Sequence, residues 1–279
     1  MKKVLAILLS VLMLAGVLAG CGTPAPSAPT KFVVLEDKLE AEEYGIGFRN
    51  EDYALGAAVQ DALDAMIADG KAAEICQKWF GKDVMLKSAN AYDTLPAAIS
   101  DDSLQKIKDK GELVLGLDAS FPPMGFTDEN NEIVGFDIDL AEEVCARLGV
   151  KLKKQPIDWD AKEMELNAGN IDCIWNGMSI NDERVENMLI LKPYIANAQV
   201  MIAPDNSSIR KIADMAGKKV GLQKGSSALD AVQGCEVFDQ IGEIVEYADN
   251  VTCYMDLKTG RIDVMVVDEV VGRYLIETE

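Results

Sequence analysis

The side chains with the clearest chemical context lie between Ile171 and Arg184, in the stretch IDCIWNGMSINDER. Its opening residues are mostly apolar and predict a buried strand. A turn is expected at Asn176-Gly177, and Asn181 can cap a helix whose first turn contains Arg184. The stretch therefore predicts a hydroxyl (Ser179) and a guanidinium at the carboxyl end of a strand, where open α/β sheets bind ligands.

Arg184 and Asp268 carry opposite charges, and each follows an apolar run. The planar guanidinium of Arg184 can donate to both oxygens of a carboxylate, and Asp268 suits an ammonium group. A closed cleft must pair both groups of a ligand that carries them, because unpaired buried charges are strongly destabilising. Taken singly, Arg184 is also compatible with an ion pair at a helix start, and Asp268 with a helix cap.

Small residues supply further polar groups for such a ligand. The Gly177 carbonyl and the Ser179 hydroxyl are expected beside its ammonium. The segment Gly225-Ser226-Ser227 predicts a turn into a helix, whose first amides can donate to an anion. The same segment is also compatible with a plain turn that holds no ligand.

The composition limits the chemistry that the chain can perform. Its 279 residues contain no histidine, which excludes histidine-based catalysis and histidine ligation of metals. The formal net charge of −20 argues against nucleic acid as a partner. With 49% hydrophobic residues, the chain can bury the core of one large or two medium α/β domains.

Residues 1–20 have the pattern of a bacterial lipoprotein signal peptide. Two lysines precede an apolar run, which Leu18-Ala19-Gly20-Cys21 closes. A linker rich in Gly, Pro, Ser and Ala follows at residues 21–30, which disfavours the alternative of a membrane-spanning anchor. We therefore expect lipid on Cys21 and a protein held at the extracytoplasmic face of the cell membrane.

Five cysteines remain beyond Cys21, and the absence of a CxxC pair makes zinc a weak prediction. Cys145 and Cys173 lie on apolar faces and are expected in the core. A disulfide between Cys235 and Cys253 suits an exported protein, but their spacing does not decide it. No cofactor and no metal are expected.

The alternation of apolar runs with helical periodicity predicts an α/β fold, regular from Gly111 onward. Residues 83–103 have no sustained period and are expected to form a connector. The expected strands are Lys31–Leu35, Glu43–Phe48, Leu113–Leu117, Val150–Lys153, Ile171–Trp175, Gln199–Ala203, Lys219–Leu222, Glu243–Tyr247 and Ile262–Val267. The expected helices are Tyr53–Asp69, Lys71–Phe80, Asp137–Leu148, one ending at Asn167, one capped by Ser207 or Ser208 and ending at Met215, one beginning near Ala228, one capped by Asn250 and ending at Thr259, and one opened by Asp268.

The stretch LNAGNIDCI at residues 166–174 is echoed by LKTGRIDVM at residues 257–265. Each is a helix end, a glycine stop and a strand, a junction that can also recur by chance. The echo fits two lobes of like topology. Facing lobes would bring the loops after these strands, with Asn176-Gly177 and Asp268, to one cleft.

Several separated segments resemble the solute-binding proteins of amino-acid ABC importers (family 3), the glutamine-binding protein type in particular. They are EEYGIGF, DASFPPMGF, GFDIDLAEEVCARLGV, NGMSINDER, LQKGSS and VVDEVVGRYLIE. The resemblance implies a two-lobed, periplasmic-binding-protein-like fold of type II. It also implies a monomer that captures a free, polar amino acid by hinge closure and delivers it to importer permease subunits without catalysis.

The resemblance implies roles for individual residues as well. It gives Arg184 the ligand carboxylate, as the chemistry does, and places Phe121 and Trp159 on the two faces of the ligand side chain. Asp118 and Gln223 would meet the polar tip of that side chain. Phe121 and Trp159 are alternatively plain core residues.

The order of the motifs departs from the family pattern. LEAEEYGIGF and helices ending in KWFG close a chain of that family, whereas here they lie at residues 39–48 and 78–81, ahead of DASFPPMGF. This order indicates a circular permutation in which residues 83–103 bridge the ancestral ends, natural or engineered; the alternative is a misalignment.

The permutation fixes the expected lobes. The large lobe would span residues 44–202, and the small lobe would join residues 31–43 to residues 203–279. Crossings near Glu43-Tyr44 and Ile202-Ala203 would form the hinge.

Two other functions remain compatible with the residues. A cleft enzyme, such as a dehydratase of small acids, would need a carboxylate as its acid or base, and none is free beyond those already assigned. A ligand-sensing domain would report to another protein, usually through a fused signalling or membrane-spanning region.

Overall fold

The computed structural model describes residues 31–87 and 90–278. The expected signal peptide, the lipid site at Cys21 and the linker fall outside these residues. Within them, no helix combines the length and the apolar character needed to cross a membrane.

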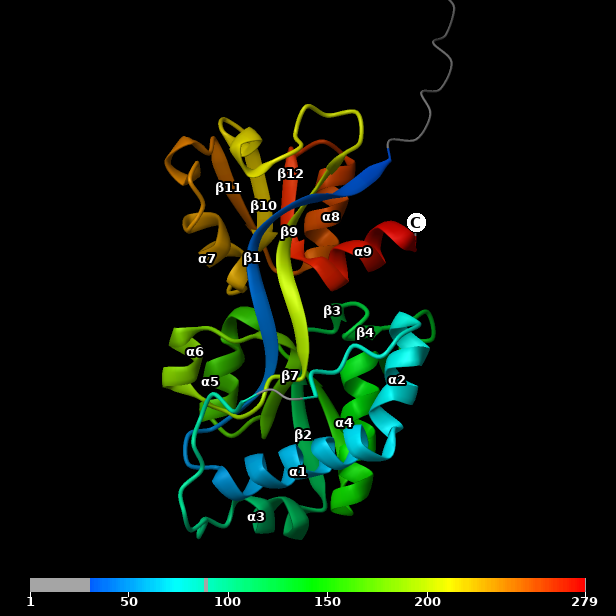
Figure 1. Cartoon of the computed structure of the whole chain (residues 1–279), viewed down its shortest axis with the longest axis vertical. Coiled ribbons are helices and arrows are strands. Elements are labelled where there is room, and N and C mark those ends of the chain that lie inside the picture. Colours follow the sequence, from blue (N-terminus) through cyan, green and yellow to red (C-terminus); the bar gives the residue numbers. More distant parts are fainter. Residues whose placement is uncertain (1–30, 88–89, 279) are drawn as a thin grey trace, which may run out of the picture. The chain divides into compact units, whose positions relative to one another are not determined.

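A nine-stranded mixed sheet runs through the described chain in the order β11-β10-β12-β9-β1-β7-β2-β6, with β8 paired to β1 (Figure 1). A small sheet contains β3, β4 and β5. The strands are β1 (Phe32–Phe48), β2 (Glu112–Leu117), β3 (Ser120–Phe121), β4 (Gly125–Thr127), β5 (Ile133–Val134), β6 (Lys151–Pro156), β7 (Cys173–Ser179), β8 (Leu189–Ile190), β9 (Ile195–Pro204), β10 (Lys219–Gln223), β11 (Glu243–Tyr247) and β12 (Val264–Asp268). The α-helices are α1 (Tyr53–Asp69), α2 (Lys71–Phe80), α3 (Ser103–Lys110), α4 (Phe136–Leu148), α5 (Lys162–Asn167), α6 (Asp182–Asn187), α7 (Ser227–Gln233), α8 (Asn250–Lys258) and α9 (Glu269–Glu277). Short 3-10 helices are η1 (Trp159–Ala161), η2 (Ile212–Met215) and η3 (Phe238–Gln240).

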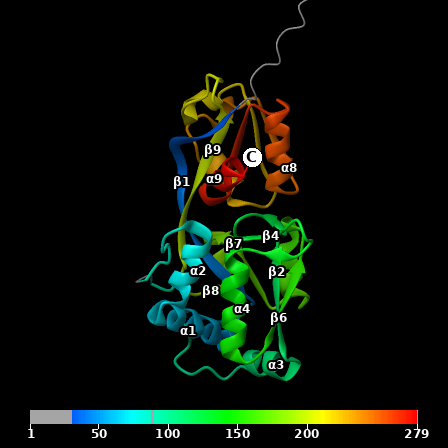
Figure 2. The same ribbon diagram turned by 90° about the vertical axis from the view of Figure 1, so that its right-hand side faces the viewer.

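The large lobe comprises α1 to α6, η1 and β2 to β8. Its strands β6, β2 and β7 are parallel, and β2 is buried almost throughout, as its unbroken apolar sequence predicts. The helices α1, α2 and α4 pack against one another beside this sheet (Figure 2). Their apolar stripes bury Leu55, Leu63 and Val144 in one continuous core.

The small lobe comprises η2, η3, β10 to β12 and α7 to α9. Its strands β11, β10 and β12 are also parallel. Val220, Leu222 and Val264 are fully buried in a core of its own, and α8 and α9 cover the other face of the sheet. Both lobes are therefore α/β units of the expected type.

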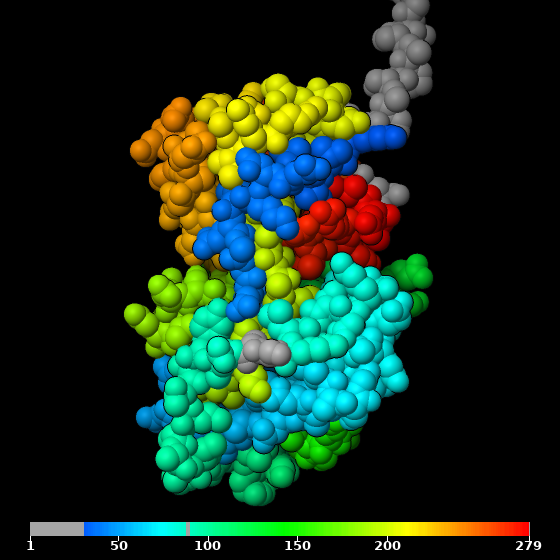
Figure 3. All heavy atoms as spheres, in the orientation of Figure 1, coloured from blue at the N-terminus to red at the C-terminus, as the bar shows by residue number. Residues whose placement is uncertain are grey.

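Strands β1 and β9 pass side by side between the lobes (Figures 1 and 3). They pair antiparallel from Phe32 with Pro204 to Tyr44 with Ile195, with register shifts around Lys38. Two separate strands were expected at residues 31–35 and 43–48. One continuous strand forms instead because the charged segment between them also pairs with β9.

The pairing also bears on where the chain crosses between the lobes. Glu43 pairs with Ala196, whereas Gln199 to Ile202 already pair with β12 of the small lobe. On β1, Tyr44 already pairs with Ser179 of the large lobe, and a crossing near Glu43 stays a prediction. For β9, the pairing favours a crossing near Ala196 over one at Ile202-Ala203.

Four local predictions are wrong. Asn176-Gly177 is not a turn, because β7 continues through it to pair with β1, with Gly177 at φ +56° and a register shift opposite. The connector ends in an unexpected helix, α3. The helix expected after Ser207 or Ser208 is the 3-10 turn η2, preceded by Lys211. Asp249 rather than Asn250 caps α8, accepting from the Thr252 amide at 2.7 Å.

The five described cysteines are free thiols. Cys145 and Cys173 are buried in the large-lobe core, as expected. Cys253 is fully buried and Cys235 packs against a different core cluster. The disulfide between them, left open by the sequence, is not formed.

Candidate functional site

The predicted site residues gather where parallel strands of the two lobes end. In the large lobe, β2 and β7 end at Leu117 and Ser179. In the small lobe, β10 and β12 end at Gln223 and Asp268. These ends face one another, since the Gln223 side-chain amide donates to the Asp118 carboxylate at 2.7 Å. Eight of the ten predicted residues are buried there, and Gly225 and Ser226 are half-buried.

Arg184 forms one pole of the cleft. It lies in the first turn of α6, whose N-cap is Asn181 as predicted, and its side chain is 5% exposed. Its guanidinium donates to the Ser179 carbonyl at 2.5 Å and to the Gly225 carbonyl of the other lobe at 3.2 Å. Within the described chain no carboxylate lies within 4.0 Å of it, so the helix-start ion pair is not formed.

Lys162 lies beside Arg184 at this pole and is not among the site residues predicted from the sequence. It is the first residue of α5 and is 6% exposed. Its Nζ donates to the Gly225 carbonyl at 3.0 Å and lies 5.2 Å from the centre of the Trp159 ring. A cavity of about 460 Å³ borders both cations.

Asp268 forms the opposite pole. Its Oδ1 accepts from the Tyr44 hydroxyl and from the Asn197 side-chain amide, each at 2.7 Å. Burial, together with the nearby charge of Glu42, raises the pKa of Asp268 to about 7. No cation of the described residues pairs with it, and the hinge strands β1 and β9 supply its partners.

Glu42 is a second buried carboxylate at this pole, also missed from sequence. Its Oε2 accepts from Ser179 Oγ at 2.8 Å, from Gln199 Nε2 at 2.9 Å and from Asn197 Nδ2 at 3.0 Å. The hydroxyl of Ser179 thus serves Glu42 in this structure. Through Asn197, Glu42 and Asp268 share one hydrogen-bond donor.

Two buried acceptors near these acids have no hydrogen-bond partner among the described residues. They are Asn197 Oδ1 and Gln199 Oε1, whose nitrogens are held by the carboxylates. An unpaired buried acceptor is costly and calls for a donor. The acid pole therefore has the capacity to accept further N–H bonds.

Asp118 and Gln223 meet at a third point in the cleft. Besides its bond to Asp118, Gln223 accepts from Asn250 Nδ2 at 2.9 Å and donates to the Ala248 carbonyl at 3.0 Å. Burial raises the pKa of Asp118, and no cation lies within ion-pair distance of it in the described chain. Asn250, predicted as a helix cap, instead orients Gln223.

The remaining predicted residues shape the walls. The Phe121 ring lies so close to Gly177 that a β-carbon there would meet it at 2.7 Å. Asp137 fixes this part of β7 by accepting from the Gly177 amide at 2.7 Å and from the Tyr194 hydroxyl at 2.9 Å. Trp159 is 7% exposed and stacks with Lys162.

Gly225 and Ser226 lie where α7 begins. Gly225 has a φ of +68° and lies against the backbone of Asp160 in the other lobe. The amide and hydroxyl of Ser226 both donate to the Gln223 carbonyl, at 3.3 and 2.7 Å. In this structure the amide of Ser226 is therefore used within its own turn.

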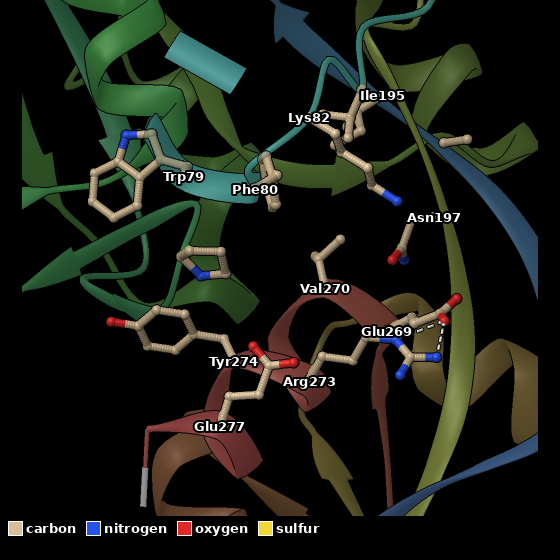
Figure 4. Close-up of a pocket in the computed structure, with 13 residues that line it drawn as sticks. Trp79, Phe80, Lys82, Ile195, Asn197, Glu269, Val270, Arg273, Tyr274 and Glu277 are labelled. Atoms are coloured by element: carbon tan, nitrogen blue, oxygen red, sulfur yellow. Dashed lines mark hydrogen bonds and ion pairs between the residues drawn. The ribbon is translucent and has the colours of Figure 1, made fainter. Parts of the chain in front are cut away.

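A larger cavity, of about 560 Å³, lies beside the hinge between α2, β9 and α9 (Figure 4). Trp79, Phe80, Val270 and Tyr274 give it apolar walls, while Arg273 is paired with a neighbouring glutamate (Figure 4). None of the ten predicted residues lines it. Asn197 of the acid pole also borders this cavity, and its Arg273 and Glu269 are paired with each other. We take the charged poles as the candidate site, because buried charges without a partner favour a ligand of opposite charge. In the described chain no cluster of three Cys, Asp or Glu side chains is placed to hold a metal.

Comparison with known proteins connects this geometry to a family. Residues 113–244 match the family model for bacterial extracellular solute-binding proteins, family 3. The chain is 32% identical over 180 residues to the L-cystine-binding protein TcyJ of Escherichia coli, a match that covers 62% of this chain and 65% of that protein. The match thus falls short of the whole length of this relative.

Solved structures give the same relation. The arginine-bound form of truncated ArgBP from T. maritima is 35% identical, with a TM-score of 0.59 over 63% of this chain and 82% of that truncated chain. A substrate-binding protein of an ABC uptake transporter from Streptococcus pneumoniae, with bound histidine, is 36% identical, with a TM-score of 0.58 over 63% of this chain and 74% of that chain.

Proposed function

The chain belongs to the bacterial extracellular solute-binding proteins of family 3, and from that premise we propose that it captures a free amino acid for an ABC importer. Of the relatives named above, one is a cystine-binding protein, one is ArgBP in an arginine-bound form and one is a substrate-binding protein with bound histidine. We propose binding without turnover, by a monomer.

The observation that carries this proposal is the pair of opposite, unpaired poles linked through Ser179, whose carbonyl accepts from Arg184 and whose hydroxyl donates to Glu42 beside Asp268. Arg184 is a buried cation without a carboxylate, and Asp268 is a buried acid without a cation. A zwitterion satisfies both, with its carboxylate at Arg184 and its ammonium at Asp268. The free acceptors Asn197 Oδ1 and Gln199 Oε1 lie at the ammonium end.

The ligand side chain would extend toward Asp118 and Gln223. A buried acid without a cation favours a polar side chain that donates, and most of all a cationic one. Phe121 and Trp159 would flank that side chain. Relatives that bind arginine and histidine are consistent with this choice.

Ligand capture would proceed by hinge closure. Contacts such as Gln223 with Asp118 and Arg184 with Gly225 join the lobes, and they exist only when the lobes are together. A ligand that bridges both poles would therefore shift the population toward this arrangement. The paired segments at Glu43 and Ala196 would form the hinge.

We further propose that the chain is circularly permuted and anchored by lipid on Cys21. The permutation is supported by the motif order, and by matches that cover only 60 to 65% of this chain but up to 82% of a solved relative. Residues 90–102, within the proposed bridge, form no helix or strand. The anchor rests on the sequence of residues 18–21.

A thermal-shift screen of the mature protein against free amino acids tests the main proposal. A ligand above its dissociation constant should raise the melting temperature. For the best ligand, Arg184→Ala should cost roughly 2–5 kcal/mol of binding free energy by calorimetry, since it removes one member of a buried charge pair.

Arg261→Ala is the matched control, because Arg261 is 71% exposed and pairs with Asp256 away from the cleft. Its affinity should equal that of the native protein. A screen without any hit would contradict amino-acid binding, and unchanged affinity in Arg184→Ala would remove Arg184 from the site.

A further inference from the structure

We propose that Lys162 is a second carboxylate-binding cation, which acts with Arg184 and couples recognition of the ligand carboxylate to closure of the cleft. The inference rests on the proposed function and adds a specificity-determining residue to it. Three observations carry it: the burial of Lys162, its shared acceptor with Arg184, and the lobe to which that acceptor belongs.

Lys162 is buried without a counter-ion. It is 6% exposed, and no carboxylate of the described residues lies within 4.0 Å of its Nζ. Its partners are the carbonyls of Trp159 at 3.3 Å and Gly225 at 3.0 Å, and the face of the Trp159 ring. Surface lysines keep their ammonium in water. This one is held inside by neutral groups only.

The acceptor shared with Arg184 brings the two cations together. Arg184 Nη2 donates to the same Gly225 carbonyl at 3.2 Å, so both cations lie within reach of a single carboxylate. Two like charges buried side by side repel each other unless an anion lies between them. A ligand carboxylate at Arg184 supplies that anion.

None of the acids around Lys162 forms an ion pair with it. Burial and the Arg184 charge lower the pKa of Lys162 to about 8, while Glu163, Asp160 and Glu183 act in the opposite direction. Asp160 is bound at 2.7 Å by Lys224 of the small lobe. The other two acids do not come within ion-pair distance of Lys162, which leaves the ligand as its missing partner.

The Gly225 carbonyl ties this recognition to closure. Gly225 belongs to the small lobe, whereas Lys162 and Arg184 belong to the large lobe. Separation of the lobes removes the shared acceptor from both cations at once. A ligand carboxylate that neutralises them stabilises the arrangement in which Gly225 can approach, so carboxylate binding and closure assist each other.

Calorimetry with matched ligand pairs tests the assignment. The probes are the free amino acids of the thermal-shift screen, each compared with its α-carboxamide, which lacks the anionic charge. Lys162→Met should weaken binding of the free acid about tenfold or more, the effect of losing a hydrogen bond to a charged group. Binding of the carboxamide should change less than about threefold, so the discrimination between the two should shrink.

Lys162→Arg keeps a cation that can also lie over the Trp159 ring, and at pH 7 it should preserve the preference for the free acid over the carboxamide within about threefold of the native protein. Between pH 8 and 9 the native protein should lose affinity as Lys162 deprotonates, whereas Lys162→Arg should lose less. Titration of the ligand ammonium is common to both proteins and cancels in the comparison. Should Lys162→Met fail to fold, this pH profile carries the test alone.

Lys153→Met, at an exposed lysine of β6, is the control and should bind like the native protein. Equal loss for acid and carboxamide in Lys162→Met would overturn the inference, because it would indicate a general closing contact. Native affinity in Lys162→Met would overturn it as well. A native protein that binds no amino acid would instead remove the proposed function on which the inference rests.

Discussion

Arg184 and Asp268 are each surrounded by neutral hydrogen-bonding groups. Backbone carbonyls hold the guanidinium, while a phenol and an amide hold the carboxylate. Such groups orient a charge without neutralising it, so its attraction for a ligand is retained. The same arrangement makes the empty cleft electrostatically unfavourable, which gives ligand binding part of its driving force.

Gly225 is the residue at which a single methyl group should act most directly on closure. A β-carbon there would lie 2.9 Å from the Asp160 backbone of the opposite lobe, at a φ of +68° that L-residues rarely adopt. Gly225→Ala should therefore weaken ligand binding about tenfold or more while the lobes themselves stay folded. Calorimetry and small-angle scattering with ligand would measure the loss of affinity and of compaction.

Gly217→Ala is the matched control. Gly217 has a similar φ of +70°, but nothing lies within 4 Å of its would-be β-carbon. It reproduces the backbone strain in the same lobe without the clash. Equal loss of affinity in both variants would show that strain, rather than contact between the lobes, causes the effect.

The sequence reveals the site residues that end a strand or begin a helix. Arg184 follows its Asn181 cap, and Asp268 follows an apolar run, so local pattern suffices for both. Lys162 also begins a helix, but a lysine at a helix start normally faces water, so its position did not mark it as a site residue. Glu42 lies inside the recognised EEYGIGF motif, but its importance depends on bonds to Asn197, 155 positions away.

At the scale of elements, an aromatic contact joins the lobes outside the polar cleft. The ring centroids of Tyr274 on α9 and Phe126 on β4 lie 5.7 Å apart. The ring of Phe126 in turn packs edge-on against Trp79 on α2, with a centroid distance of 6.0 Å. Trp79 is in turn fixed by its bond to Asp139 at 2.7 Å. Tyr274 of the small lobe thus packs against the Phe126–Trp79 pair of the large lobe.

Removal of that ring should favour the open arrangement. Tyr274→Ala should weaken ligand binding by about threefold to tenfold, the range expected for one aromatic pair. Tyr274→Phe keeps the ring and should bind like the native protein. Calorimetry on the three proteins measures the difference; identical affinities would show that the contact does not contribute to closure.

Most elements follow from periodicity, and two of the exceptions, β1 and Gly177, have a shared physical cause. β1 carries a charged centre that reads as a loop, yet β9 pairs with it for most of its length. Gly177 reads as a turn, yet β1 pairs with β7 on both sides of it. In both cases long-range pairing overrides local propensity, and a local pattern contains no information about the partner strand.

At the scale of the molecule, the buried acids predict opposite pH trends for stability and binding. Burial raises the pKa values of Asp137 and Asp268 to about 7, above those of the unfolded chain. The native state therefore keeps these protons longer, and their contribution to the free energy of unfolding decreases as pH rises from about 4 to 7. Ligand affinity should increase over the upper part of this range, because an ammonium requires ionised Asp268.

Thermal melts with and without ligand, from pH 5.5 to 7.5, check both trends. Asp268→Asn isolates the contribution of that residue from the surface acids, several of which have lowered pKa values and act oppositely. The unliganded variant should show a less negative dependence of stability on pH than the native protein. An identical pH dependence would mean that Asp268 does not titrate in this range.

The proposed permutation predicts that the chain tolerates reordering. The end of α9 and the start of β1 lie in the same lobe (Figures 1 and 2). A chain that runs from residue 104 to residue 278, then through a short linker to residues 31–82, should keep the fold and bind ligand within a few-fold of the native protein. Failure to fold, with a linker long enough to span the gap, would contradict the permutation.

Because β1 precedes both lobes in the chain, it is synthesised before β9, the strand with which it forms the hinge. During synthesis this strand emerges before β9, which pairs with it through contacts such as Glu42 to Asn197 and follows 155 positions later. Until then its backbone is an unpaired edge, the feature that drives chains to aggregate. The acids and lysine in EDKLEAEE, which obscured the strand in the sequence, discourage such pairing between chains. The segment that later bends between the lobes thus first has to avoid aggregation while it is an unpaired strand.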